Sequence, residues 1–391
     1  MNKSITLLFG LIFSATTSII AENSPYISKV YEYSPAPGQF INEMPEYEEG
    51  DNYETMLAKV EEQICGDRNP GMISLGAYGG YVVFGFDHPV VNVENAYDFK
   101  IYGNAFLANG SSSGGSCEPG IVMVSVDENG DGLPNDKWYE LAGSEYNKET
   151  TKKNYQITYY QPAADKVAEP DPDYKIITDA TYIKYTTNDS EQPEGYVKKN
   201  SFHSQSYWPE WIDAETLEFN GTKLADNYSD ESGNGTYYVL NYFDWGYADN
   251  LPNETDAGFM IDWAVDSNGN PVKLNKIDFV KVYTAVNQYC GWIGETSTEI
   301  SGAEDLHPEA EISGVEYVVE GSDEVMLLAG NSDILVLRNG GNEIYTYIYA
   351  MNGDMVKSAM LSHGDNTIDV SMLPNGIYLL RCGNKAIKFK I

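Results

Sequence analysis

The sequence predicts an all-β protein: a β-sandwich or jelly-roll body with one short helix near its start, followed by a small Ig-like β-sandwich domain. Three observations support this class. Tyrosine occurs 31 times in 391 residues, and aromatic and β-branched residues favour strands. Short apolar runs recur between polar turn residues over most of the chain. The pattern changes near residue 305, and the roughly 80 residues that follow are enough for one small domain.

The N-terminal stretch predicts a secretory signal peptide at residues 1–21. Lys3 is the only charge before position 22, residues 5–20 are mostly apolar, and Ala21 is a small residue at the polar boundary. A membrane anchor is the alternative, but it needs about 20 mostly apolar residues. Serine and threonine interrupt this shorter run, and no later run is long enough to cross a bilayer. We therefore expect no transmembrane segment in the mature chain.

The predicted body spans residues 22–305. Its helix is expected at 53–65, because Met56, Val60 and Ile64 recur at helical spacing. The expected strands are 81–86, 98–102, 121–126, 138–141, 237–240, 258–263 and 277–283. Residues 144–200 are polar and rich in Lys, Asp and Pro, so we expect long surface excursions there.

An acidic, proline-containing stretch predicts a linker at 306–311 and a second domain at 312–391. Strands are expected at 333–337, 343–350, 355–361 and 385–391, and residues 373–381 read as a turn that leads into a strand. The Asn352-Gly353 pair lies between two of these strands, and Asn-Gly accepts the positive φ of a tight hairpin turn.

Several ordered blocks of this tail resemble a known sorting domain. The Asn352-Gly353 hairpin, residues 366–369 (NTID), residues 373–378 (LPNGIY) and the alternating basic and apolar end resemble the type A C-terminal sorting domain of the type IX secretion system in the Bacteroidetes. The resemblance covers about residues 312–391. It implies recognition by the secretion machinery, export through the periplasm, and release or attachment at the outer-membrane surface, often with removal of the tail. An Ig-like domain without a sorting role is the alternative.

The body is similar to a group of bacterial cell surface proteins with jelly-roll domains. The similarity rests on residues 98–106 (DFKIYGNAF), 118–125 (EPGIVMVS), 138–140 (WYE), 246–249 (GYAD), 277–282 (IDFVKV) and 294–299 (GETSTE). Some of these proteins resemble surface components near vitamin B12 uptake systems of gut Bacteroidetes. The resemblance carries no binding residue over to this chain.

Charge and cysteine usage limit the partners. The formal net charge is -35, and so acidic a surface repels phosphate backbones, which excludes nucleic acid. The four cysteines, Cys65, Cys117, Cys290 and Cys382, form no CxxC pair, which disfavours a zinc site. An exported chain can form disulfides, but these spacings do not define the pairing.

Residues 127–136 (DENGDGLPND) predict a structural calcium loop. Oxygen donors alternate along a tight turn, as Ca²⁺ sites require. The expected ligands are the side chains of Asp127, Asn129, Asp131 and Asp136 and the backbone carbonyl of Leu133. Trp138 stands at position 12 in place of an acid, and an Asp/Asn/Gly turn without metal is the alternative. Residues 266–271 repeat the spacing, but Asn268-Gly269 there is typical of a simple hairpin turn.

Aromatic clusters at 207–211, 242–247 and 289–292 are candidate ligand surfaces, because flat rings offer apolar area to sugars and other ring-shaped ligands. The predicted ligand-binding residues are Trp208, Trp211, Trp245, Tyr247 and Trp292. We expect Trp208 and Trp211 to be exposed, since Pro209 and Glu210 interrupt any strand between them. Packing of these rings in the core is the alternative.

No catalytic motif stands out. The four histidines lack metal-ligand spacing, the serine-rich residues 111–116 lack a strand–turn–helix context, and 59 acids offer too many carboxylate pairs to select one. The sequence therefore favours a non-catalytic, calcium-stabilised protein, extracellular or at the outer-membrane surface, that binds a glycan or a small molecule such as a corrinoid. A secreted glycan-active hydrolase and a structural or adhesive surface protein are the alternatives.

Overall fold

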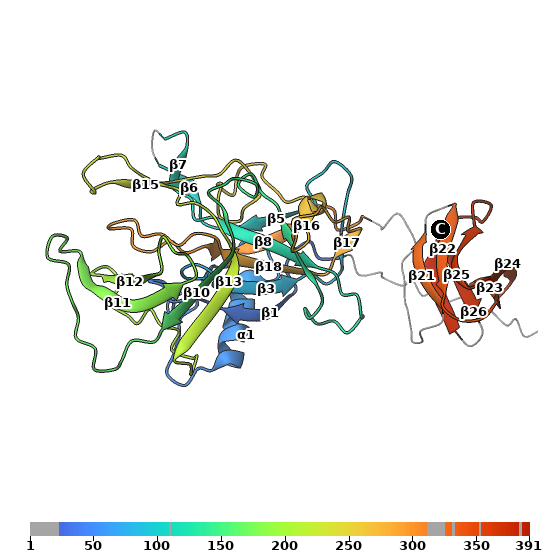
Figure 1. The fold of residues 1–391 in the computed structure, drawn as a ribbon, viewed down its shortest axis with the longest axis horizontal. Helices are drawn as coiled ribbons and strands as arrows, with labels where there is room; N and C mark the ends of the chain where they lie inside the picture. The colour runs from blue at the N-terminus through green and yellow to red at the C-terminus, as the bar shows by residue number, and fades with distance from the viewer. Residues whose placement is uncertain (1–22, 109–110, 311–324, 331–332, 352, 383–384) are drawn as a thin grey trace, which may run out of the picture.

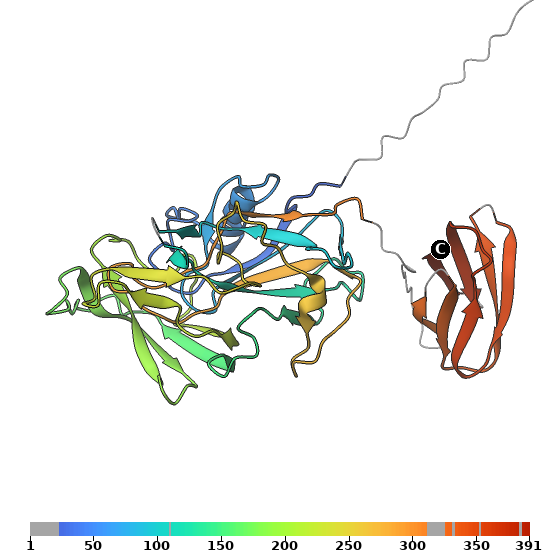
Figure 2. The same ribbon diagram turned by 90° about the horizontal axis from the view of Figure 1, so that it is seen from above.

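The computed structural model describes residues 23–108, 111–310, 325–330, 333–351, 353–382 and 385–391 (Figures 1 and 2). The predicted signal peptide, residues 1–21, lies outside the described residues. In the part that is described, no helix has the length and hydropathy needed to cross a membrane.

The body is all-β, as predicted, and is built around an antiparallel sheet of six strands (Figure 1). In spatial order the strands are β1 (Lys29–Ser34), β3 (Tyr81–Gly85), β18 (Phe279–Thr284), β8 (Gly120–Ser125), β9 (Trp138–Leu141) and β16 (Ala264–Val265). Predicted strands at 81–86, 121–126 and 138–141 are confirmed within one or two residues. This sheet brings residues from both ends of the body side by side.

One face of the six-stranded sheet packs against the helix. Val82 of β3 and Val122 of β8 both pair with Val282 of β18, and all three side chains lie in one core. The helix α1 (Tyr53–Ile64) adds Met56, Val60 and Ile64 to this core, as its periodicity predicts. Its first turn is held by a capping box.

The opposite face carries a second sheet, and here one prediction is wrong. Residues 144–200 are not surface excursions. They supply three strands of a four-stranded sheet, in the order β12 (Glu194–Asn200), β11 (Ile177–Thr187), β10 (Lys152–Tyr160) and β13 (Thr216–Lys223). Tyr155, Ile157 and Tyr159 alternate inward along β10 and pack with Ile121 and Tyr283 of the first sheet. In Figure 2 this sheet, drawn in green, lies on the other side of the body from the blue helix.

Residues 258–263 do not form the predicted strand. Phe259 makes a single bridge to Phe99 of β5 (Phe99–Tyr102), and a 3-10 helix, η1 (Ile261–Trp263), follows. The cause is the buried carboxylate of Asp98, which accepts backbone hydrogen bonds of 2.6 Å from both Val93 and Ile261. These bonds replace strand pairing in this segment.

Shorter strands complete the body. A third sheet has the order β14 (Tyr228–Asp230), β15 (Tyr238–Asn241), β7 (Gly114–Ser116) and β6 (Phe106–Leu107). Three two-stranded ladders pair β17 (Lys276–Ile277) with β4 (Val90–Val91), β19 (Glu299–Ile300) with β2 (Ile73–Ser74), and β20 (Gly302–Asp305) with β5. The predicted strand at 277–283 is therefore divided between β17 and β18.

The C-terminal segment is a separate β-sandwich with its own core. One sheet contains β21 (Val325–Gly330), β22 (Ile334–Asn339) and β25 (Gly364–Asp369), and the other contains β24 (Met355–Leu361), β23 (Ile344–Ala350), β26 (Ile377–Cys382) and β27 (Lys385–Lys390). The predicted hairpin is present, because β23 and β24 pair and Gly353 has a φ of 91°. Leu335, Ile348 and Leu380 are among the residues that fill the core between the two sheets.

In the described structure Cys65, Cys117 and Cys290 are free thiols, and the Cys382 thiol donates to the Thr346 hydroxyl at 2.9 Å. Cys117, Cys290 and Cys382 are buried and Cys65 is partly buried, and burial raises the pKa of the first two to about 12. They pack as small apolar residues.

Candidate ligand-binding cleft

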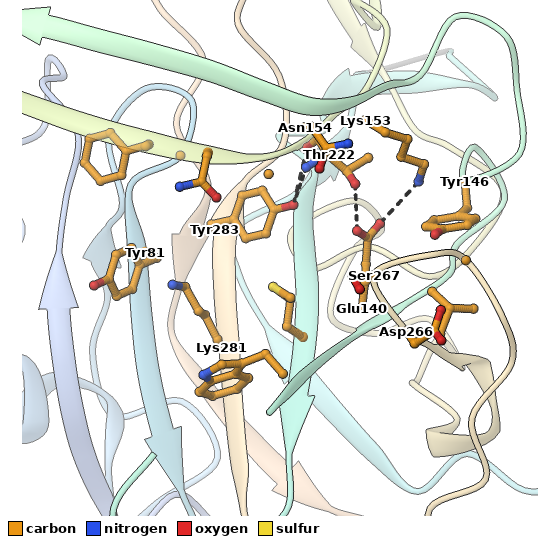
Figure 3. A pocket seen from close by; sticks show the side chains of 18 of the residues that line it. Tyr81, Glu140, Tyr146, Lys153, Asn154, Thr222, Asp266, Ser267, Lys281 and Tyr283 are labelled. Carbon is orange, nitrogen blue, oxygen red and sulfur yellow. Dashed lines mark hydrogen bonds and ion pairs between the residues drawn. The ribbon is translucent and has the colours of Figure 1, made fainter. Parts of the chain in front are cut away.

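A cleft of about 890 Å³ lies between the six-stranded sheet and the strands β10 and β13 of the second sheet (Figure 3). Its floor is one face of the six-stranded sheet, because Lys281 pairs with Met123 and Met123 pairs with Glu140 across three adjacent strands. The wall residues come from β10 and β13, and the rim comes from Tyr146, Asn147 and the turn at 266–269.

Strand alternation places polar side chains on this floor. Val280 and Val282 of β18 point into the helix-side core. Lys281 lies between them and Tyr283 follows Val282, so these two side chains point the opposite way, toward the cleft. The same alternation on β9 buries Leu141 in the core and directs Glu140 into the cleft.

Glu140 is the centre of the polar contacts in the cleft. The Thr222 hydroxyl donates a 2.6 Å hydrogen bond to its Oε2, and Lys153 Nζ lies 3.8 Å from its Oε1 (Figure 3). Burial raises the pKa of the Glu140 carboxyl, and Lys153 and Thr222 offset part of that effect. Burial also lowers the pKa of Lys153 to about 8, in spite of the favourable charge of Glu140. The cleft therefore holds an acid and a base that titrate closer to neutrality than usual.

Two lysines cover aromatic rings at the cleft. Lys153 Nζ lies 2.9 Å from the centroid of the Tyr146 ring, and Lys281 Nζ lies 3.5 Å from that of Tyr81. The Tyr81 hydroxyl donates to Glu32 Oε2 at 3.1 Å, which fixes its ring. Burial lowers the pKa of Lys281, and the charge of Glu32 offsets part of this. Cation–π contacts of this kind hold charged and aromatic groups together at a ligand surface.

The cleft thus combines ring faces, amides, two ammonium groups and carboxylates. Trp138 also lines it, as do Asn154, Asn220, Glu218 and Asp266. Such a mixture can hydrogen-bond to hydroxyl groups while the rings contact apolar faces of a ligand.

Two of the predicted ligand-binding rings are in the core. The expectation that Trp208 and Trp211 are exposed is wrong, because only 2% and 8% of their surfaces are accessible. The side chain of Asn42 bonds to the backbone of Ser206, Trp208 and Glu210, and so holds their loop against the body. Trp211 then stacks on the ring of Tyr33 at 6.0 Å.

The other three predicted rings lie outside the cleft lining. Trp245 and Tyr247 line a smaller hollow of about 240 Å³ with Lys100, Asn253 and other polar residues. Tyr247 is buried, and its hydroxyl accepts a hydrogen bond from the Glu145 backbone. Trp245 is 41% exposed, and its ring centroid lies 4.6 Å from that of Trp263. Trp292 is equally exposed but lines neither hollow.

The predicted calcium loop is an exposed turn that its own side chains organise. Asp127 accepts from the backbone of Gly130 at 2.7 Å and of Gly132 at 2.9 Å. The ligand candidates Asn129 and Asp131 accept from backbone groups within the same turn, and Asp136 accepts from the Glu128 backbone at 3.1 Å. In the described part of the chain, these carboxylates do not gather into a group of three with ligand atoms within 4.8 Å of one another. Calcium binding at this loop stays a prediction.

Sequence reasoning missed the cleft because its residues come from seven strands and from the turns next to them. A signal was present: Lys281 interrupts a valine run, and Glu140 stands between Tyr139 and Leu141, so the strand period turns both charged side chains to the face opposite their apolar neighbours. The pairing of β9 with β8 and of β13 with β10, which brings them together, cannot be read from the sequence.

Comparison with known proteins identifies the C-terminal segment. Residues 331–390 match the family model described as a secretion system C-terminal sorting domain. This match and the mostly-β structure fit a Bacteroidetes surface protein with a type IX sorting tail, so the chain is exported to the cell surface or secreted. The resemblance of the body to surface proteins near vitamin B12 uptake systems has no support from these comparisons.

The comparisons give no functional information on the body. No curated protein matches the chain. A solved structure of a beta-glucuronidase from Faecalibacterium prausnitzii aligns with 73% of this chain and 47% of that chain, at 11% identity and a TM-score of 0.15. The chain spans about half the length of that enzyme, and a likeness at this TM-score carries no argument.

Proposed function

We propose that the body of this exported protein binds a carbohydrate in the cleft between its two sheets. The observation that carries the proposal is the cleft itself, about 890 Å³ and lined by tyrosine, tryptophan, amide and charged side chains. Sites for small ligands typically have a volume of about 300–1,000 Å³. A sugar presents hydroxyl groups at its edge and apolar C–H groups on its face, and this lining can satisfy both.

The net charge of the protein favours a neutral ligand over an anionic one. At -35 the protein repels polyanions, whereas a neutral sugar experiences no electrostatic repulsion. Lys153 and Lys281 stay inside the cleft by contact with tyrosine rings, so they can donate hydrogen bonds to a ligand from fixed positions. A corrinoid or another small molecule remains an outcome of the test below.

We also propose that Ca²⁺ stabilises the body at the loop of residues 127–136. The turn places Asp127 Oδ2 over the backbone N–H of Gly132 at 2.9 Å, so the carboxylate at loop position 1 faces the glycine at position 6. The same fold of the loop brings Asn129 and Asn135 beside Asp131. Oxygen atoms of these side chains would surround the ion.

A hydrolase is the second candidate, and Glu140 is the observation that favours it. A carboxyl with a raised pKa in a cleft can act as a general acid, and Glu218 and Asp266 line the same cleft. The binding test therefore includes product analysis. A structural or adhesive role would give neither binding nor product.

The test is a calorimetric screen of the purified protein against glycans and corrinoids, with product analysis of each mixture. For a ligand that binds, Trp138→Ala and Tyr146→Ala should each weaken binding by about 2 kcal/mol, or roughly thirtyfold in Kd. Trp245→Ala in the smaller hollow is the control and should leave Kd unchanged. Loss of binding only in the Trp245 variant would move the site to that hollow and refute the cleft.

A further inference from the structure

Three acidic side chains converge inside the body, away from the cleft. Glu118 precedes β8, Asp249 lies in the loop after β15, and Glu299 is the first residue of β19. A carboxylate oxygen of each lies within 4.8 Å of those of the other two. The side chains are 7%, 3% and 1% exposed, so all three are more than nine-tenths buried.

This cluster lacks a protein counter-charge. Within the described residues, no Lys, Arg or His makes an ion pair with any of the three carboxylates. Burial raises the pKa of all three, and the neighbouring carboxylates raise those of Glu118 and Glu299 further. An uncompensated buried charge is costly, so this site requires either bound protons or a bound cation.

The hydrogen bonds around the cluster favour charged carboxylates over protonated ones. Asp249 Oδ1 accepts from the backbone N–H groups of Asn104 and Ala105, each at 2.8 Å, and its Oδ2 accepts from that of Glu299 at 3.0 Å. A backbone N–H can only donate, so a proton on Oδ1, which accepts two of these bonds, would displace one of them. Three such donors on one aspartate favour its ionised form and oppose the effect of burial on its pKa.

Glutamate oxygens without hydrogen-bond partners indicate a bound ligand at this cluster. Ser74 and Ser297 donate to Glu299 Oε1 at 3.0 and 2.6 Å, whereas Glu299 Oε2 is buried and has no hydrogen-bond partner among the described residues. Oε2 of the adjacent Glu295, which is 3% exposed, is unpartnered as well, and its charge contributes to the raised pKa of Glu118. Buried polar atoms without partners are rare, and an ion bound by the three carboxylates would satisfy Glu299 Oε2.

We propose that Glu118, Asp249 and Glu299 bind a Ca²⁺ ion that clamps three distant segments of the body. Ca²⁺ binds six to eight oxygens at about 2.4 Å, so two ligands on opposite sides of the ion lie about 4.8 Å apart. The observed spacing fits within that limit. The segments already meet there, because the Glu118 backbone N–H donates to the Asp249 carbonyl at 2.8 Å and Glu299 pairs with Ser74.

The experiment measures the calcium content per chain and the melting temperature of the purified full chain, after dialysis against EGTA and after return of Ca²⁺. It uses the Asp127→Asn/Asp131→Asn variant as its background, so the exposed loop of residues 127–136 makes no contribution. We expect one calcium per chain in this background and a melting temperature that falls with EGTA and recovers with Ca²⁺.

Two further variants locate the ion. Glu299→Gln in the same background keeps the side-chain shape and should lose both the calcium and the response of the melting temperature. Glu94→Gln, a substitution of an exposed glutamate, removes one charge elsewhere and should retain both. If the background protein binds no calcium and melts at the same temperature with and without it, the proposal fails, whether or not the Glu299 variant folds. Retention of the ion by Glu299→Gln would also overturn it.

Discussion

The hydroxyl of Thr222 on β13 donates a 2.6 Å hydrogen bond to Glu140 Oε2 on β9, and this bond joins the two sheets that enclose the cleft. Thr222 is 4% exposed, and the carboxyl it contacts is mostly shielded from water. The contact therefore couples the packing of the sheets to the position of the acid in the cleft.

Thr222→Val should remove this bond while it keeps the β-branched shape. Because hydrogen bonds to charged groups contribute about 1.5–3 kcal/mol, we expect the free energy of unfolding to fall by about 2 kcal/mol. Chemical denaturation of the wild type and the variant measures this free energy of unfolding. Thr216→Val, at the exposed start of the same strand, is the control and should change the free energy by less than about 0.5 kcal/mol. Equal effects of the two substitutions would contradict the coupling.

The pKa of about 8 at Lys153 predicts a pH dependence of stability. The pKa in the folded state lies below the ordinary value of 10.5, so the folded state favours the neutral amine. The contribution of the neutral Lys153 amine to the free energy of unfolding is complete above pH 10.5. It is lost as the pH falls through about 8. The free energy of unfolding of the wild type, relative to Lys153→Met, should therefore rise between pH 7 and pH 10.

Lys152 is the matched control for this titration. It is the neighbouring residue of β10, and hydrogen bonds to Asp189 and Glu191 raise its pKa. A comparison of the wild type with Lys152→Met should show no gain in relative stability over the same range of pH. A flat profile for Lys153→Met would show that its ammonium group is not desolvated.

The fold class was predictable because the main sheet follows simple alternation and the helix follows simple periodicity. Residues 144–200 were misread because tyrosines take the inward positions of β10. Tyr155 and Tyr159 are buried, yet each hydroxyl has a partner, the amide of Asn287 for Tyr155 and the carbonyl of Tyr78 for Tyr159. A tyrosine-rich strand with polar residues between the rings therefore looks polar in sequence, although its inner face is a core.

The candidate site was less predictable than the fold. Interruption of a strand by Pro209 does imply a loop, but it does not imply that the loop's rings are exposed. Asn42, more than 160 positions earlier in the chain, anchors that loop through its backbone and turns Trp208 inward. Contacts over such distances in sequence depend on the tertiary fold, so local patterns cannot reveal them.

The burial of Trp208 and Trp211 predicts large losses of stability on truncation. Trp208→Ala and Trp211→Ala should each lower the free energy of unfolding by about 3–5 kcal/mol, as is typical of buried aromatic residues. Trp292→Ala is the control, because its ring is 41% exposed and should cost less than about 1 kcal/mol. The melting temperatures of the three variants, compared with that of the wild type, measure these losses of stability. A stable Trp208 variant would show that its loop opens in solution.

The loop of residues 127–136 should contribute a separate calcium-dependent increment. Binding to the native state alone stabilises by about 2.7 kcal/mol at a hundredfold excess over Kd. Asp127→Ala should remove this increment while the buried cluster of Glu118, Asp249 and Glu299 keeps its own ion. Calorimetric titration of the two proteins measures the number of sites. If the variant and the wild type bind equal amounts of calcium, the loop is a turn without metal.

Deletion of residues 312–391 should leave a folded body in the periplasm. The sorting domain matches at residues 331–390, and among the described residues the two cores of the body contain none beyond Ala303, so the truncated body keeps these cores. Cell fractionation and the protease sensitivity of intact cells give the location, and a cooperative melting transition shows that the truncated protein is folded. As a reciprocal control, residues 312–391 fused to a periplasmic carrier should carry it to the cell surface. Surface display of the truncated body would show that export does not depend on the tail.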